Sequence, residues 1–389
     1  MFNGANLINP AVASLKPSAI RKYFTIADTF PDALSLGIGE PDFVTPKHIL
    51  QAGVDSLYAG KTQYTANNGL PSLRGEIAAY MERRFNVSYN PEKEIICTVG
   101  GSEALDIVFR AFLQPGDEII IPEPCFVAYR ALATLCGATV VTINTTKENS
   151  FKLMPEELKA AITPKTKLLL LSYPSNPTGG VMTKDELEAI AKVLRDTNIM
   201  VVSDEIYAEL SYGIEHTSIA SLPGMRERTV IVSGFSKAFA MTGWRMGYCC
   251  APAEVFKYIA QIHQYIIMSS PTPSQYAALE AMKNGQQDYE YMRDEYDKRR
   301  KYIYSELLRM GFDCFEPQGA FYFFPDVSMF AKDGEDFVEN LLEEEHVAVI
   351  PGNAFGESGK NHVRISYAYS LDTIKQAFER IERFINRRK

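Results

Sequence analysis

A lysine and an arginine stand eight positions apart in the segment Ser233-Gly-Phe-Ser-Lys237-Ala-Phe-Ala-Met-Thr-Gly-Trp-Arg245. The amine of Lys237 could form a Schiff base with an aldehyde, and the guanidinium of Arg245 could hold a phosphate. Because the neighbours of the lysine are small or apolar, we expect its amine to be partly desolvated and easier to deprotonate. The segment therefore indicates a site for an aldehyde cofactor that carries a phosphate.

Three further segments place polar groups directly after short apolar runs. Gly100-Gly101-Ser102 could begin a helix whose free N–H groups and hydroxyl bind an anion. Asn176 could donate its amide N–H to a phenolate-type oxygen. Asp204 could pair with a protonated ring nitrogen, and Tyr207 could reach the same side. Taken singly, the glycine and aspartate segments are better explained as a turn and a helix cap, whereas a proline-rich turn without chemistry is a weaker explanation for the whole octet around Asn176.

The elements that must position these residues alternate along the middle of the chain. Short β-rich runs alternate with helical stretches, which is typical of a mostly parallel sheet with helices on both faces. In such sheets ligands bind beyond the carboxyl ends of the strands, where the candidate residues lie. The expected strands are 95–99, 118–121, 139–143, 167–172, 199–203 and 229–232, and the expected helices begin near Ser102, Cys125, Pro155 and Thr183.

The pattern changes after about residue 285. We expect a charged helix through 291–310, a strand at 320–324 and a last helix from residue 371. Residues 18–23 with 37–39 could close over a substrate as a lid, or the arm could serve only to stabilise a dimer. The predicted division is an N-terminal arm over 1–45 that belongs with the small domain, a large cofactor-binding domain over 46–285 and a smaller α+β domain over 286–389.

The composition argues for small-molecule chemistry. A formal net charge of −8 and a pI near 5.4 argue against a nucleic-acid surface. The six cysteines form no C-x-x-C pair, and no apolar run or N-terminal pattern predicts a membrane span or a secretion signal, so we expect a cytoplasmic protein. The five histidines lack the spacing of metal ligands, so no metal is expected. No G-x-G-x-x-G motif follows the first strand, which argues against a nicotinamide-dependent dehydrogenase.

Seven segments, in this order and spacing, make the chain similar to a known family. They are Gly37-Ile-Gly-Glu-Pro-Asp-Phe43, Tyr64-Thr-Ala-Asn-Asn-Gly-Leu-Pro-Ser-Leu-Arg74, the Gly100-Gly101-Ser102 loop, Tyr173-Pro-Ser-Asn-Pro-Thr-Gly179, Asp204-Glu-Ile-Tyr207, the lysine segment and Val363-Arg-Ile-Ser-Tyr367. The chain resembles the class I/II aminotransferases that depend on pyridoxal phosphate and have fold type I, in particular the aspartate and aromatic aminotransferases. The resemblance implies an α/β protein whose large domain holds a mostly parallel seven-stranded sheet.

The resemblance also implies a role for each site residue. Lys237 would form the Schiff base with pyridoxal phosphate and then move a proton, and Asp204 would keep the pyridine nitrogen protonated. Asn176 and Tyr207 would bind the O3′ oxygen, and Phe126 would stack on the ring. The remaining positions are Gly101, Ser102, Ser236 and Arg245 around the phosphate, Tyr64 reaching the phosphate from the other subunit of a homodimer, and Gly39, Asn176 and Arg364 around the substrate carboxylate.

The chain departs from the family pattern at two points. Gly234 stands where many members have a phosphate-binding serine, so Ser233 or Ser236 must serve instead. No arginine occurs between Arg245 and Arg293, where members specific for dicarboxylic substrates often carry a second one. Three residues could substitute for it but are more often ordinary surface residues: Arg21, Lys22 and His263.

The leading hypothesis is an aminotransferase that works by ping-pong. It would take the amino group from an L-amino acid and pass it to a 2-oxo acid, with 2-oxoglutarate as the usual acceptor by resemblance. The same cofactor also supports β-elimination of sulfur substrates, so a β-lyase is the alternative. A cofactor-sensing regulatory module is less favoured, because no helix-turn-helix segment precedes the arm and the charge is acidic.

Overall fold

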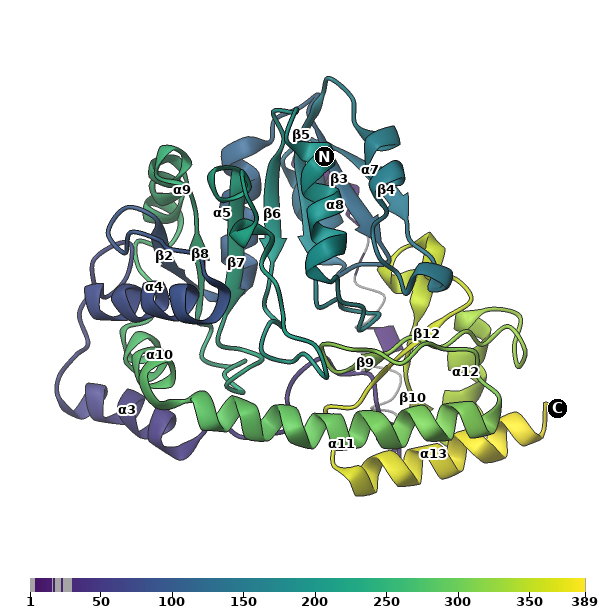
Figure 1. The fold of residues 1–389 in the computed structure, drawn as a ribbon. Helices are drawn as coiled ribbons and strands as arrows, with labels where there is room; N and C mark the ends of the chain where they lie inside the picture. The colour runs from purple at the N-terminus through teal and green to yellow at the C-terminus, as the bar shows by residue number, and fades with distance from the viewer. Residues whose placement is uncertain (1–3, 16, 18–21, 24–29, 389) are drawn as a thin grey trace.

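The fold was analysed in a computed structural model that describes residues 4–15, 17, 22–23 and 30–388. Figure 1 shows a large sheet with helices on both faces. The long helix α11 (Gln286–Met310) runs along the bottom of this view, beside a smaller group of strands and helices. No helix in the described part of the chain is long and apolar enough to cross a membrane.

The large sheet has seven strands in the order β2-β8-β7-β6-β5-β3-β4. They are β2 (Ile95–Thr98), β3 (Glu118–Glu123), β4 (Thr139–Asn144), β5 (Thr166–Ser172), β6 (Met200–Asp204), β7 (Thr229–Gly234) and β8 (Gly247–Cys250). The run from β4 to β7 is parallel, whereas β8 is antiparallel to both of its neighbours. The sequence pattern did not indicate β8, because it follows β7 without the intervening helix that marks the other strands.

Apolar side chains on both faces explain why the central strands take these places. In β5, Leu168 and Leu170 pack under one helical layer, and Leu169 and Leu171 pack under the other. The first layer contains α5 (Gly100–Phe112), α6 (Ala128–Leu135) and α9 (Ala253–Ile266); the second contains α7 (Pro155–Ala161) and α8 (Lys184–Leu194), with α4 (Pro71–Phe85) and α10 (Thr272–Asn284) over β2 and β8.

Two predicted helix starts differ from the structure. Helix α5 begins at Gly100 rather than near Ser102, so the first glycine already belongs to it. Helix α6 begins at Ala128 rather than near Cys125, because the backbone N–H of Cys125 donates to the Phe355 carbonyl oxygen at 2.8 Å. Helix α7 begins at Pro155 as predicted, and α8 begins directly after its N-cap Thr183.

The C-terminal part contains a second core. Strands β11 (Ile350–Pro351), β12 (Val363–Ser366) and β9 (Tyr322–Phe323) form an antiparallel sheet in that order. Helices α11, α12 (Gly334–Glu345) and α13 (Leu371–Asn386) bury apolar side chains in the same core. Strand β1 (Leu34–Ser35) pairs in parallel with β10 (Val347–Ala348), which brings the N-terminal segment to this part of the molecule. The domain limits at residues 45 and 285 stay a prediction.

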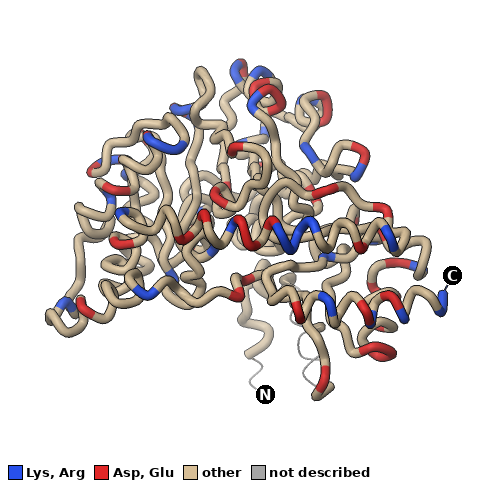
Figure 2. Tube along the Cα trace, turned by 60° about the horizontal axis from the view of Figure 1, so that its bottom comes forward, with Lys and Arg blue, Asp and Glu red and all other residues tan. Residues whose placement is uncertain are grey.

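Charges of both signs are interspersed along α11 (Figure 2). Several of them pair within the helix, for example Lys301 with Asp297 at 2.6 Å and Arg309 with Glu306 at 2.7 Å. Such exposed pairs contribute little stability each. The helix buries Tyr296, Ile303 and Leu307 on its other side, and this apolar side fixes its position.

Candidate active site

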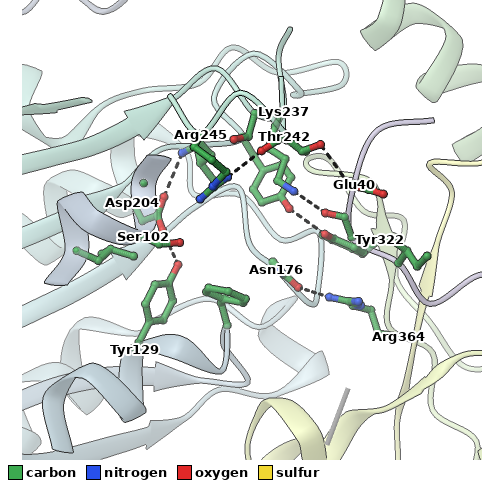
Figure 3. Close-up of a pocket in the computed structure, with 18 of the residues that line it drawn as sticks. Glu40, Ser102, Tyr129, Asn176, Asp204, Lys237, Thr242, Arg245, Tyr322 and Arg364 are labelled. Carbon is green, nitrogen blue, oxygen red and sulfur yellow. Dashed lines mark hydrogen bonds between the residues drawn. The ribbon is translucent and has the colours of Figure 1, made fainter. Parts of the chain in front are cut away.

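A cavity of about 550 Å³ lies at the carboxyl ends of β6 and β7, next to β9 (Figure 3). This is the edge of the sheet where ligands bind in α/β folds. The cavity brings together the predicted residues Gly39, Gly101, Ser102, Phe126, Asn176, Asp204, Tyr207, Ser236, Lys237, Arg245 and Arg364. Residues separated by more than 300 positions in the sequence thus line one space.

Lys237 follows β7 and points into the cavity, where its Nζ donates a hydrogen bond to the carbonyl oxygen of Gly39. Burial lowers the pKa of this amine to about 8, and the positive charge of Arg364 contributes to the shift. A substantial fraction of the amine is therefore neutral near pH 8. This is the state in which a lysine attacks a carbonyl or accepts a proton.

Asp204 is the last residue of β6 and is buried beside the cavity. Its Oδ2 accepts a hydrogen bond from the Tyr129 hydroxyl at 2.7 Å, and its Oδ1 accepts one from the Ile206 N–H at 3.2 Å. Burial raises the pKa of Asp204 to about 6, against the opposing effect of the Tyr129 hydrogen bond. Asp204 forms no ion pair with any described residue, so this carboxylate can pair with a cationic group of a ligand.

The first turn of α5 and the side chain of Arg245 form an anion cup. Gly100 has φ +73°, and a Cβ there would lie 2.5 Å from Nη2 of Arg245, so the guanidinium sits directly on the helix start. Arg245 is held by a 2.8 Å hydrogen bond from its Nη1 to the Thr242 carbonyl oxygen. Gly101, Ser102 and Ser236 line the same cavity. Free helix N–H groups, hydroxyls and a guanidinium together suit a phosphate.

The backbone around Gly234 explains why no serine occurs there. Gly234 pairs with Gly247 across β7 and β8, and a Cβ on Gly234 would lie 2.9 Å from the Gly247 Cα and 3.0 Å from the Met246 carbonyl oxygen. A side chain at this position would require the strands to separate. The Ser233 hydroxyl donates instead to the Glu205 carbonyl oxygen at 3.4 Å, which leaves Ser236 as the hydroxyl that lines the cavity.

Arg364 lies in β12 and is almost completely buried at the opposite side of the cavity. Its Nη1 donates to Oδ1 of Asn176 at 2.8 Å, and its Nη2 donates to the Gly37 carbonyl oxygen at 2.6 Å. Its Nε has no hydrogen-bond partner among the described residues. Burial lowers the pKa of Arg364. A planar cation with an unused donor is well suited to bind a carboxylate.

Among the cavity residues that were not predicted from the sequence, four have polar side chains: Glu40, Tyr129, Thr242 and Tyr322. Tyr129 lies three residues after Phe126, which the family resemblance had already singled out, so its proximity in sequence was an available signal. Tyr322 lies in an aromatic run that is typical of a buried strand, and no sequence signal separates it from core residues.

Some predicted residues lie elsewhere. Tyr64 does not line the cavity, and its side chain is 80% exposed. His263 is buried between Oε1 of Glu103 at 2.6 Å and the Asn67 carbonyl oxygen at 2.7 Å, so it is a structural residue rather than a substitute for an arginine. Lys22 pairs with Glu339 at 3.2 Å. Residues 18–21 of the predicted lid, Arg21 among them, lie outside the described residues.

These features fit pyridoxal phosphate. The cavity holds a buried amine for the aldehyde, a buried carboxylate without an ion-pair partner for the ring nitrogen, and an anion cup for the phosphate, and Phe126 lies in its wall. Within the described part of the chain, no group of three or more His, Cys, Asp or Glu side chains could hold a metal ion.

Comparison with known proteins agrees with this site. The family Aminotransferase class I and II matches residues 31–381. The Bacillus subtilis (strain 168) protein named "Putative aminotransferase YugH" is 50% identical over 97% of both chains. An aspartate aminotransferase from Pyrococcus abyssi is 43% identical, over 96% of this chain and 97% of its own. A double mutant of Thermus thermophilus aspartate aminotransferase has a TM-score of 0.93 at 40% identity, covering 97% of this chain and 99% of its own.

The matches extend over nearly the whole chain and include high structural similarity, so they confirm the predicted fold type, enzyme class and cofactor. The chain belongs to the class I and II aminotransferases, and it transfers amino groups with the help of pyridoxal phosphate.

Proposed function

We propose that this enzyme takes the amino group of an L-amino acid and passes it to 2-oxoglutarate by a ping-pong reaction, in the cytoplasm. One observation carries the substrate part of this proposal. Lys237 and Arg364 donate hydrogen bonds to the carbonyl oxygens of Gly39 and Gly37, which are only two residues apart. A single α-amino acid is therefore of the right size to place its carboxylate at Arg364 and its α-carbon near the lysine amine.

Each side chain of the cavity then has a distinct task. Bound pyridoxal phosphate withdraws electrons from the substrate α-carbon, so that its proton becomes removable. The neutral amine of Lys237 would take this proton from the α-carbon and deliver it to the C4′ atom of the cofactor. Asp204, held by Tyr129, keeps a positive charge on the ring nitrogen, while Asn176 and Tyr207 donate to the O3′ oxygen. The anion cup of Gly101, Ser102, Ser236 and Arg245 holds the phosphate.

The cavity favours an amino donor with a neutral or aromatic side chain. Apart from Arg245 in the anion cup, Arg364 is the one arginine that the described residues contribute to the lining, and it is assigned to the α-carboxylate. Apolar side chains of Ile38, Leu105 and Ile206 line other parts of the wall. A second carboxylate would gain little here, whereas an apolar side chain would be desolvated favourably.

We propose that the active enzyme is a homodimer in which each subunit supplies Tyr64 to the phosphate of the other. Tyr64, Val44 and Tyr265 are each at least 80% exposed in the single chain, which is costly for apolar side chains unless another surface covers them. Light scattering tests the dimer. Mixed dimers of Tyr64→Ala and Lys237→Ala chains should regain one intact site and hence part of the activity, whereas an inactive mixture would contradict shared sites.

An amino-donor screen tests the function. Each L-amino acid is added to the enzyme loaded with pyridoxal phosphate, and the loss of the visible absorption of the bound cofactor is followed. Glutamate formed from 2-oxoglutarate is measured as the product. We expect neutral or aromatic donors to react fastest. The proposal fails if cysteine or cystathionine yields pyruvate and ammonia faster than any donor yields glutamate, because that result would indicate a β-lyase.

A further inference from the structure

Tyr322 is a fully buried tyrosine in β9 whose hydroxyl reaches the wall of the active-site cavity. The Tyr322 and Tyr207 hydroxyl oxygens are 2.8 Å apart. The Arg364 guanidinium lies 4.5 Å from the centre of the Tyr322 ring. A Cβ on Gly39 would lie 2.5 Å from the Tyr322 hydroxyl. The side chain therefore touches residues on both sides of the cavity, the cofactor side and the carboxylate side.

The hydrogen-bond partners of the two tyrosines indicate which hydroxyl donates in the hydrogen bond between them. Tyr207 is the one described residue with which the Tyr322 hydroxyl forms a hydrogen bond. In the proposed function Tyr207 uses its one hydroxyl proton for the O3′ oxygen of the cofactor, so its oxygen can only accept in the pair with Tyr322. The Tyr322 hydroxyl therefore donates to the Tyr207 oxygen across the 2.8 Å between them.

We propose that Tyr322 is a positioning residue with two separable parts. Its hydroxyl donates to Tyr207, so that the proton of Tyr207 points into the cavity towards the O3′ oxygen of the cofactor. Its ring supports the guanidinium of Arg364 and keeps that cation oriented towards the substrate carboxylate. The inference rests on the cofactor and substrate assignments of the proposed function.

The first part predicts a spectroscopic effect. A donor that itself accepts a hydrogen bond becomes a stronger donor, by about 10–30% per bond. With Tyr322 in place, Tyr207 stabilises the deprotonated form of the O3′ oxygen more strongly. Loss of the Tyr322 hydroxyl therefore raises the pH midpoint at which the visible band of the enzyme-bound cofactor titrates.

The test compares Tyr322→Phe and Tyr322→Leu with the wild-type enzyme. In Tyr322→Phe the ring remains, so we expect the midpoint to rise by roughly half a pH unit while KM for the amino donor changes less than about twofold. In Tyr322→Leu the support of Arg364 is also lost, so KM rises about tenfold in addition. Tyr367→Phe is the matched control, because Tyr367 is equally buried and donates to the Ala320 carbonyl oxygen outside the cavity.

Three further readouts decide the outcome. An unshifted midpoint in Tyr322→Phe, or an equal shift in Tyr367→Phe, overturns the role of the hydroxyl. A persisting shift from Tyr322→Phe in a Tyr207→Phe background also overturns it, because the effect must pass through Tyr207. A wild-type enzyme without any visible band would overturn the proposed function itself, which separates the two failures.

Discussion

Asp204 and Glu205 are neighbours in sequence and both are buried, but they lie in two different surroundings. Glu205 accepts hydrogen bonds from Ser203 at 2.8 Å and Ser218 at 2.7 Å, and its other oxygen lies 3.1 Å from Nε2 of His216. Asp204 points into the cavity, with a tyrosine hydroxyl and one backbone N–H as its partners. One carboxylate is fully satisfied by the protein, and the other is not.

Two buried arginines repeat this contrast. Arg300 donates to Asp297 at 2.8 Å, to Glu316 at 2.6 Å and to the Pro317 carbonyl oxygen at 2.9 Å. Arg364 has no carboxylate partner among the described residues and keeps its Nε unpaired. Leaving a buried donor unpaired costs about 1–3 kcal/mol. Buried charges with incomplete partners therefore mark the surface that binds ligands, and completely paired ones mark the scaffold.

The largest expected effect comes from removing the amine of Lys237, which lines the same cavity as Asp204. Lys237→Ala eliminates the nucleophile and the proton carrier, so kcat/KM should fall by about 10⁴-fold. The free energy of unfolding should change by no more than about 1 kcal/mol, because the amine forms no ion pair with any described residue and the substitution removes only its hydrogen bond to the Gly39 carbonyl oxygen. Steady-state kinetics and thermal unfolding measure the two quantities. Activity within tenfold of wild type would contradict the assignment.

Asp204→Asn tests the unsatisfied carboxylate. We expect kcat/KM to fall by roughly 10²–10³-fold, because a neutral amide cannot hold a positive charge on the ring nitrogen. In the cofactor-free protein the folded pKa of about 6 lies above the ordinary value of 3.8. The folded state thus binds the proton more tightly, and stability falls by about 2 kcal/mol as the pH rises from 4 to 6.

Urea unfolding of the cofactor-free protein at several pH values measures how the free energy of unfolding changes with pH. Asp204→Asn should remove this pH dependence, since the amide does not titrate. If the free energy of unfolding still falls between pH 4 and 6 in Asp204→Asn, another group is responsible for the titration.

Glu205→Gln tests the satisfied carboxylate and is the matched control for Asp204→Asn. The amide keeps the shape but loses the charge-assisted contacts to His216, Ser203 and Ser218, so the free energy of unfolding should fall by about 1–3 kcal/mol. Because Glu205 does not line the cavity, kcat/KM of the folded variant should stay within about threefold. A large loss of activity without a loss of stability would contradict the assignment of Glu205 to the scaffold and of Asp204 to the ligand site.

The smallest effect is expected at a partly exposed ion pair. His48 lies 2.8 Å from both Glu280 and Asp288, and these hydrogen bonds outweigh burial, so the pKa of His48 is raised. The stabilisation is present below the ordinary histidine pKa and is lost as the pH rises through the folded value. His48→Gln should cost less than about 1 kcal/mol at pH 5.5 and less still at pH 8. An equal loss at both pH values would contradict a charge-based contribution.

The sequence predicted the central strands and many residues that line the cavity, because several of these residues follow an apolar run at the same edge of the sheet. Asp204 and Lys237 could be found from their place at strand ends, and Arg364 from the family resemblance. Tyr322 could not be found, because its role arises from contacts between β9, Gly39 and Arg364 that no local pattern shows. The strand β8 was missed for a similar reason, since its partners are set by the tertiary fold.

The three glycines at the crossing of β7, β8 and α5 limit how this enzyme can be altered. A Cβ on Gly247 would lie 2.5 Å from the Gly100 carbonyl carbon, and Gly234 lies against Gly247 on the other side. Three backbones thus touch without any side chain between them. A mutant library made to change substrate preference should leave these positions fixed and vary the cavity wall at Ile38 and Leu105, where a new side chain changes the space offered to the substrate without moving the backbone that carries the catalytic lysine.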